Sequence, residues 1–198
     1  MAPHIVMNEL GMAFETEKVD LRAKTTANGT NYLTVNPRGQ VPTLQLDSKE
    51  NLNECVAIMQ YLADQKPEAN LMPKWNTLER YRAVEWLNYI ATEIHKGYTP
   101  FFTAQNLITD EAARTEFLAN NKKALLTKLE WVDAQLAGKD FLLGKQMTVC
   151  DAYLFTCLGW GQYIGLDTSH LKNLTAYSAR IYQRPAVQKT MLAEGLLK

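Results

Sequence analysis

A loop and the helix that follows it contain the residues best suited to bind a small ligand. The segment from Val35 to Pro42 has the pattern of a turn followed by an X-Pro bond that enters a strand, and Glu54 and Cys55 open a helix twelve residues later. The free N–H groups and the dipole of a helix N-terminus favour a carboxylate, whereas the Glu54 carboxylate favours an ammonium group. We therefore expect the backbone of Val41, with Glu54 and Cys55, to hold a small zwitterionic peptide.

The cysteines offer a second kind of chemistry. A thiol at a helix N-terminus has a lowered pKa and can form a mixed disulfide, so Cys55 is a candidate nucleophile. Cys55 also belongs to an apolar helical stripe, and we favour the interpretation that it is a small, buried residue beside the ligand. Cys150 and Cys157 lie seven residues apart on an apolar helix and are expected in the core. The three histidines have no metal-ligand spacing among themselves or with the cysteines, so no metal site is predicted.

Composition argues against several classes of partner. The 198 residues are 46% hydrophobic, which is enough for a sizeable core in one domain or two small ones. Twenty-one basic and twenty-one acidic side chains cancel, so the chain has no net field with which to attract nucleic acid or an anionic membrane surface. No apolar run reaches the roughly 18 residues of a membrane-spanning helix, and no signal peptide is visible. An odd number of cysteines without C-x-x-C spacing favours a reduced, cytoplasmic protein.

The elements that must position these residues are mixed in the first third of the chain. In chain order we expect a helix over 3–10 that stops at Gly11, a strand over 14–19, a brief helical piece at Tyr32-Leu33, a strand over 43–46, a polar turn over 47–51, a return strand at Leu52, and a helix over 54–65. Residues 66–76 contain two prolines and have the composition of a linker between domains.

From Thr77 onward the pattern predicts helices only. In chain order these cover 77–97, then 109–136 with Thr109 as the cap and Gly138 as the stop, then 148–158 opened by a capping box of Thr148 and Asp151, and finally a pair split at Arg184-Pro185. The segment around 99–108 is expected to be a loop. Asn88, Thr92 and His95 lie at i, i+4 and i+7, so we expect one polar helix face that lines a cleft between domains over 1–66 and 77–198.

Six motifs in chain order resemble the glutathione transferase family, and in particular its bacterial beta class. They are Asn36 to Pro42, Glu54, Tyr61 to Asp64, Glu85 to Asn88, His95 to Gly97 and Thr148 to Phe155, and the resemblance covers essentially the whole chain. It implies an α/β, thioredoxin-like N-terminal domain that binds glutathione, an all-α C-terminal domain and a homodimer. It also implies glutathione and a small electrophile as substrates, and a cis bond before Pro42.

The resemblance further implies roles for individual residues. The implied glutathione-binding residues are Lys24, Val41, Pro42, Glu54, Cys55, Asn88 and Glu93, and the implied catalytic residues near the sulfur are His95 and Lys96. Val41 would pair with the cysteinyl backbone of glutathione like a short added strand. Glu54 would accept the α-ammonium group, and Lys24 would face the glycyl carboxylate. Asn88 and Glu93 would reach the glutathione of the partner subunit.

The chain departs from the family pattern at its start. Beta-class proteins begin with a strand and a loop that carries a reactive cysteine, with a tyrosine nearby, whereas Met1 falls directly at the first helix. We expect that nucleophile to lie before Met1, removed by a start site assigned too late or by trimming rather than naturally absent. Two functions therefore remain open. One is a transferase that delivers the glutathione thiolate to an electrophile or exchanges it with a disulfide, and the other is a non-catalytic binding or interaction protein of the same fold.

Overall fold

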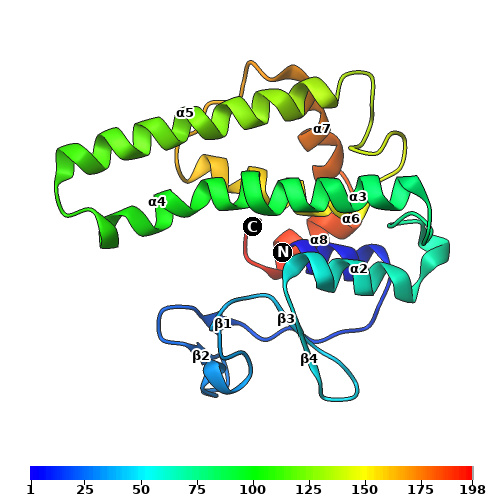
Figure 1. Cartoon of the computed structure of the whole chain (residues 1–198). Coiled ribbons are helices and arrows are strands. Elements are labelled where there is room, and N and C mark those ends of the chain that lie inside the picture. The colour runs from blue at the N-terminus through cyan, green and yellow to red at the C-terminus, as the bar shows by residue number, and fades with distance from the viewer. Residues whose placement is uncertain (198) are drawn as a thin grey trace.

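The computed structural model describes residues 1–197, and most of them are helical (Figure 1). The α-helices are α1 (Ala2–Glu9), α2 (Cys55–Gln65), α3 (Leu78–Tyr89), α4 (Lys96–Leu107), α5 (Glu111–Gln135), α6 (Val149–Gly159), α7 (Lys172–Tyr182) and α8 (Pro185–Ala193). The 3-10 helices are η1 (Tyr32–Thr34), η2 (Pro67–Ala69) and η4 (Trp160–Gln162), and η3 (Ile90–His95) is a π-helix. The strands are β1 (Val19–Asp20), β2 (Thr25–Thr26), β3 (Thr43–Gln45) and β4 (Asn51–Asn53).

The strands form two separate antiparallel ladders. β1 pairs with β2 in the register Val19 to Thr26, and β3 pairs with β4 in the register Leu44 to Leu52. The expected hairpin over 43–52 is confirmed, but the strand expected over 14–19 is wrong except at its last residue. Residues 14–17 make no backbone hydrogen bond to another described segment, and without a neighbour a strand has no ladder to stabilise it.

α2 packs against the β3–β4 ladder, and α1 and α2 lie between that ladder and the rest of the helices (Figure 1). The short helix expected over 3–10 is found at Ala2–Glu9, and Gly11 follows it with a φ of 59°, as a C-terminal glycine should. α1 packs against α2, α6 and α8, and α2 also packs against α6. Ile5 and Met59, at 0% exposure, show that this contact belongs to the core.

The junction between the two expected domains is closed by a buried ion pair. Arg80, at the start of α3, is 1% exposed and makes a bidentate contact with Asp64 of α2, at 2.7 and 2.9 Å. The linker expected over 66–76 is packed rather than free, because Leu71 and Met72 are each 6% exposed. The division into 1–66 and 77–198 stays a prediction.

α3, η3 and α4 follow one another without a break, so the helix expected to end at 97 continues to Leu107. The loop expected around 99–108 is therefore wrong. Pro100 lies inside α4, and burial of Tyr98 and Ala104 stabilises the helix in spite of it. Gly97 matters for packing, since a Cβ there would come within 2.9 Å of Leu125 on α5.

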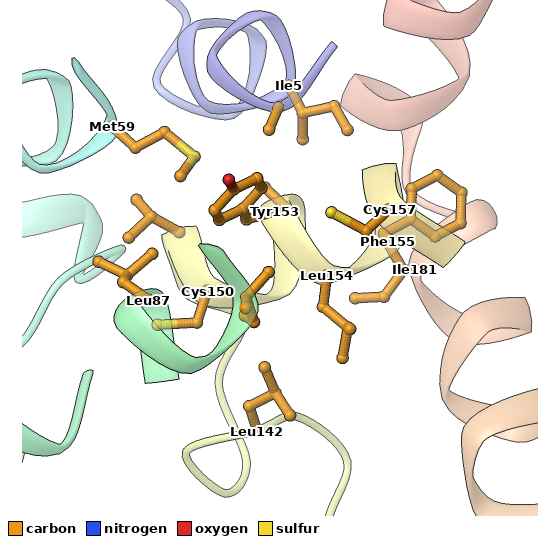
Figure 2. Close-up of a cluster of buried hydrophobic side chains, with 14 of the residues drawn as sticks. Ile5, Met59, Leu87, Leu142, Cys150, Tyr153, Leu154, Phe155, Cys157 and Ile181 are labelled. Carbon is orange, nitrogen blue, oxygen red and sulfur yellow. The ribbon is translucent and has the colours of Figure 1, made fainter. Parts of the chain in front are cut away.

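The remaining helices begin largely where the sequence indicates. The long helix α5 is capped by Asp110, whose carboxylate accepts the Ala113 N–H at 2.7 Å, and not by the expected Thr109. The capping box of α6 is confirmed, because the N–H and hydroxyl of Thr148 both donate to Asp151. Every residue from 149 to 157 is buried, and Figure 2 shows α6 with apolar side chains projecting from it toward its neighbours. The final pair also splits as expected, with Pro185 as the first residue of α8.

Candidate functional site

The loop before β3 carries an exposed residue. The Val41–Pro42 bond is cis, as the resemblance implies, and Val41 is 47% exposed. Two side chains fix the loop by donating hydrogen bonds to the carbonyl of the residue before Val41. The Tyr32 hydroxyl and the Asn36 amide both donate to the Gln40 carbonyl, at 2.7 and 2.8 Å. Val41 is thus an exposed residue on a firmly supported loop.

Glu54 sits at the bare N-terminus of α2. Its φ is 70°, a value that non-glycine residues rarely adopt, and its side chain makes no capping hydrogen bond. The first N–H groups of an α-helix have no partner within the helix, so those at the start of α2 are available to a ligand. A strained residue beside an uncapped helix end is typical of binding sites.

The Glu54 carboxylate already has one protein partner. Arg38 donates from Nη1 to Glu54 Oε1 at 2.7 Å, and both side chains are more than half exposed. The sequence reasoning missed this pair, although Arg38 lies within the same motif as Val41. The second carboxylate oxygen of Glu54 makes no hydrogen bond to a described residue.

Cys55 follows Glu54 and is partly buried. Burial raises the pKa of its thiol to about 12, and the nearby Glu54 charge adds to the rise. Burial thus favours the neutral thiol and opposes the lowering expected at a helix N-terminus. The favoured interpretation of Cys55 as a small residue beside the ligand stays a prediction.

His95 ends the π-helical segment and turns toward α6. Its Nδ1 lies 2.7 Å from the hydroxyl of Tyr153, and its ring meets the Trp160 ring edge-on, with centroids 4.8 Å apart. Burial lowers the pKa of His95, the Lys96 charge lowers it further, and the Glu54 charge opposes both. Lys96 itself is exposed.

The Glu54 charge acts on two groups near α6. Burial lowers the pKa of His95, and the Glu54 charge opposes this lowering. Burial raises the pKa of Tyr153, and the Glu54 charge adds to the rise. The expected grouping of the start of α2 with His95 stays a prediction. Tyr153 was missed, since within an apolar helix a tyrosine looks like a core residue.

Lys24 lies against the supported loop. Its Nζ donates to the Gly39 carbonyl at 2.8 Å. Its side-chain carbons lie so close to Gly39 that a Cβ added to the glycine would be 3.2 Å from Cδ and Cε of Lys24. Lys24 is half-buried, so its ammonium group stands beside the loop that carries Val41.

Asn88 and Glu93 make their contacts to residues outside this group. Asn88 is exposed and bonds to the Val84 carbonyl of its own helix, and Glu93 pairs with Lys128 of α5 at 2.9 Å. The expected shared face of Asn88, Thr92 and His95 stays a prediction; it assumes α-helical spacing, and the wider turns of η3 depart from that spacing.

Neither a metal cluster nor a membrane helix is found in the described part of the chain. Residues 1–197 contain no group of three or more His, Cys, Asp or Glu side chains placed to hold a metal ion. Within the same residues, no helix combines the length and apolar character needed to cross a bilayer.

Comparison with known proteins assigns the class. Residues 2–65 match the glutathione S-transferase N-terminal domain, and residues 89–185 match the glutathione S-transferase C-terminal domain. The chain is 43% identical over 196 residues to glutathione S-transferase GstA of Escherichia coli O157:H7, covering 99% of this chain and 94% of that protein. The protein belongs to the glutathione S-transferase family.

Solved structures agree with that assignment. A bacterial beta-class glutathione S-transferase from Sphingomonas chungbukensis superimposes with a TM-score of 0.91 at 42% identity, covering 99% of this chain and 94% of that one. A sphingomonad glutathione S-transferase complexed with glutathione gives a TM-score of 0.90 at 41% identity, with the same coverage. The expected architecture is confirmed as a thioredoxin-like N-terminal domain followed by a helical C-terminal domain.

Proposed function

We propose that the protein is a glutathione transferase whose site is formed by the loop at Val41, the N-terminus of α2 and His95. The observation that carries the proposal is the exposed Glu54 carboxylate at an uncapped helix end. These groups match the charged ends of a small peptide. A relative solved with glutathione bound supports glutathione as that peptide.

Each half of the site has a distinct task. Glu54 accepts the α-ammonium group of the γ-glutamyl end, and the N–H groups at Cys55 face its α-carboxylate. Val41 pairs with the cysteinyl backbone, and Lys24 approaches the glycyl carboxylate. His95 and Lys96 lie near the sulfur, where positive charge and N–H donors favour the thiolate.

The reaction follows from the thiolate. The glutathione S–H loses its proton to solvent, and the sulfur attacks an electrophilic carbon. A C–S bond forms while the bond to the leaving group breaks, and the leaving group departs with its electron pair. The chain's chief contributions are a lowered thiol pKa and an oriented sulfur.

The test combines binding with turnover. Glutathione binding is measured by isothermal titration calorimetry, with S-hexylglutathione as competitor. Conjugation to 1-chloro-2,4-dinitrobenzene is followed by the absorbance of the thioether. We expect saturable binding and turnover above the uncatalysed rate. Binding without turnover would favour the non-catalytic alternative, and absence of binding at millimolar glutathione would overturn the proposal.

We also propose that the protein is a homodimer, and that the outer face of α3 and α5 receives the second copy. A pocket of about 960 Å³ lies on this face, and none of the expected glutathione-binding or catalytic residues lines it. Its wall includes Trp86, Tyr89 and Trp131, and the ring centroids of Tyr89 and Trp131 are 4.6 Å apart. Trp131 is 45% exposed, which is unusual for a tryptophan in a cluster of rings.

A second copy fits this face because the family resemblance places Asn88 and Glu93, on the same continuous helix, near the partner's glutathione. Light scattering after size-exclusion chromatography should give twice the 22.5 kDa chain mass. Trp131→Asp should give the monomer, whereas Tyr163→Asp, at a 74% exposed aromatic residue outside this pocket, should not. A monomeric unmodified protein would refute the dimer.

The three free cysteines of the chain support placing the protein in the cytoplasm.

A further inference from the structure

The hydrogen bond between His95 and Tyr153 determines which nitrogen of the histidine carries the proton. Tyr153 belongs to α6, is 4% exposed, and lies on the side of that helix that faces Met59 and Ile5 (Figure 2). Its hydroxyl and His95 Nδ1 are 2.7 Å apart. Either atom can in principle supply the proton of this hydrogen bond, and the two choices give opposite imidazole tautomers.

The surroundings of Tyr153 decide between them. Its hydroxyl has no hydrogen-bond partner other than His95 Nδ1 among the described residues. If Nδ1 donated, the buried phenol proton would be left without an acceptor, which is costly. If the phenol donates, its proton and the Nδ1 lone pair are both satisfied. The Tyr153 hydroxyl is therefore the donor and Nδ1 is the acceptor.

The protonation states agree with this geometry. Burial raises the pKa of Tyr153, so the phenol keeps its proton. Burial lowers the pKa of His95, so the imidazole is neutral near pH 7 and carries a single N–H. That hydrogen must then be on Nε2, which makes no hydrogen bond within the described residues.

We propose that Tyr153 is a positioning residue that holds His95 in the Nε2–H tautomer, so that the imidazole offers a hydrogen-bond donor, not a base, to the glutathione sulfur. This inference rests on the proposed function for the identity of the acceptor, but not for the tautomer itself. A donor at Nε2 stabilises the thiolate and cannot take the thiol proton, which passes to water. His95 in this tautomer acts by electrostatic stabilisation of the thiolate and not by acid–base chemistry.

The tautomer is measured directly by two-dimensional NMR of protein labelled with 15N-histidine, without glutathione. Protonated and unprotonated ring nitrogens resonate in separate ranges, and His95→Gln identifies the signals among those of the three histidines. We expect His95 to show an unprotonated Nδ1 and a protonated Nε2. In Tyr153→Phe both signals should move toward values averaged between the tautomers. A protonated Nδ1 in the unmodified protein, or no change in Tyr153→Phe, would overturn the assignment.

Tyr98→Phe is the matched control. Tyr98 lies one helical turn beyond His95, is fully buried and also packs against Trp160, but its hydroxyl has no partner among the described residues. Its removal should leave the His95 signals unchanged. Circular dichroism and the unfolding midpoint show whether each variant remains folded.

The effect on the sulfur is measured separately. The ionisation of bound glutathione is followed by thiolate absorbance against pH. Its midpoint should rise by about 0.5–1 pH unit in Tyr153→Phe, the size of a weakened hydrogen bond, and not in Tyr98→Phe. An unchanged midpoint with the expected tautomer would refute the donor role. Failure to bind glutathione would refute the proposed function and leave the tautomer result standing.

Discussion

Replacing Glu54 by glutamine tests the recognition half of the site most directly. Glutamine has the same shape and adopts the positive φ of this position at the same cost, so the backbone of the uncapped helix end is unchanged. Only the negative charge is lost. The change therefore separates attraction of a ligand ammonium group from the strain and packing of the loop.

The expected magnitude follows from the exposure of the carboxylate. A hydrogen bond to a charged group contributes about 1.5–3 kcal/mol. The Glu54 side chain is 64% exposed and shares one oxygen with Arg38, so the lower end applies. A loss of about 1.5 kcal/mol weakens glutathione binding roughly tenfold. The loss of the exposed Arg38 pair itself has little further effect.

Calorimetry with glutathione gives the dissociation constants, and Glu50→Gln is the matched control. Glu50 is an exposed carboxylate in the turn before β4, away from the start of α2. Its variant should bind like the unmodified protein. Arg38→Ala frees the Glu54 carboxylate, so binding there should be equal or tighter. A change of less than threefold in Glu54→Gln, or a tenfold loss in Arg38→Ala, would refute the assigned role of Glu54.

Three further predictions concern stability. Arg80→Ala leaves Asp64 without its buried partner and should lower the free energy of unfolding by about 3 kcal/mol in urea titrations. Arg82→Ala removes an exposed ion pair on the same helix and should leave the unfolding midpoint unchanged. Equal effects of the two substitutions would contradict the reasoning. Tyr98→Phe removes a buried hydroxyl without a partner and should not lower the unfolding free energy, so a clear loss in the same titration would reveal an undetected hydrogen bond. Burial lowers the pKa of His95 in the folded protein, so the unfolded chain binds a proton at this imidazole more readily. The free energy of unfolding should therefore fall as pH decreases below about 6.5. His95→Gln should flatten that part of a curve of stability against pH.

The sequence was most informative where a local pattern specifies structure. The capping box at Thr148, the apolar spacing in α2 and the break at Pro185 each depend on residues within one or two turns, and all three are confirmed. The strand expected over 14–19 failed because a strand requires a neighbour from elsewhere in the chain. The loop expected after Gly97 failed because tertiary burial of Tyr98 outweighs local helix-breaking residues.

The candidate site divides in the same way. Glu54 and Val41 are identifiable because a helix start and an X-Pro bond have local signatures. The partner residues that define the chemistry of the site have no such local signature. Arg38 is 16 residues from Glu54, and Tyr153 is 58 residues from His95. Neither contact has a periodic or spacing signal, so both required the folded chain.

The π-helical segment has a consequence for how this helix can change in length. A wider turn accommodates an additional residue compared with an α-helix, and η3 ends at His95. Deleting one residue within 90–94 would restore a regular helix and leave the residues beyond it at nearly their present rotation relative to α3, because the wider turn already absorbs the additional residue. His95 would then still face Tyr153, and Gly97 would still face Leu125. The segment can therefore lose one residue of length without turning the histidine away from its partner, whereas the same deletion in the regular part of α4 would turn every residue beyond it.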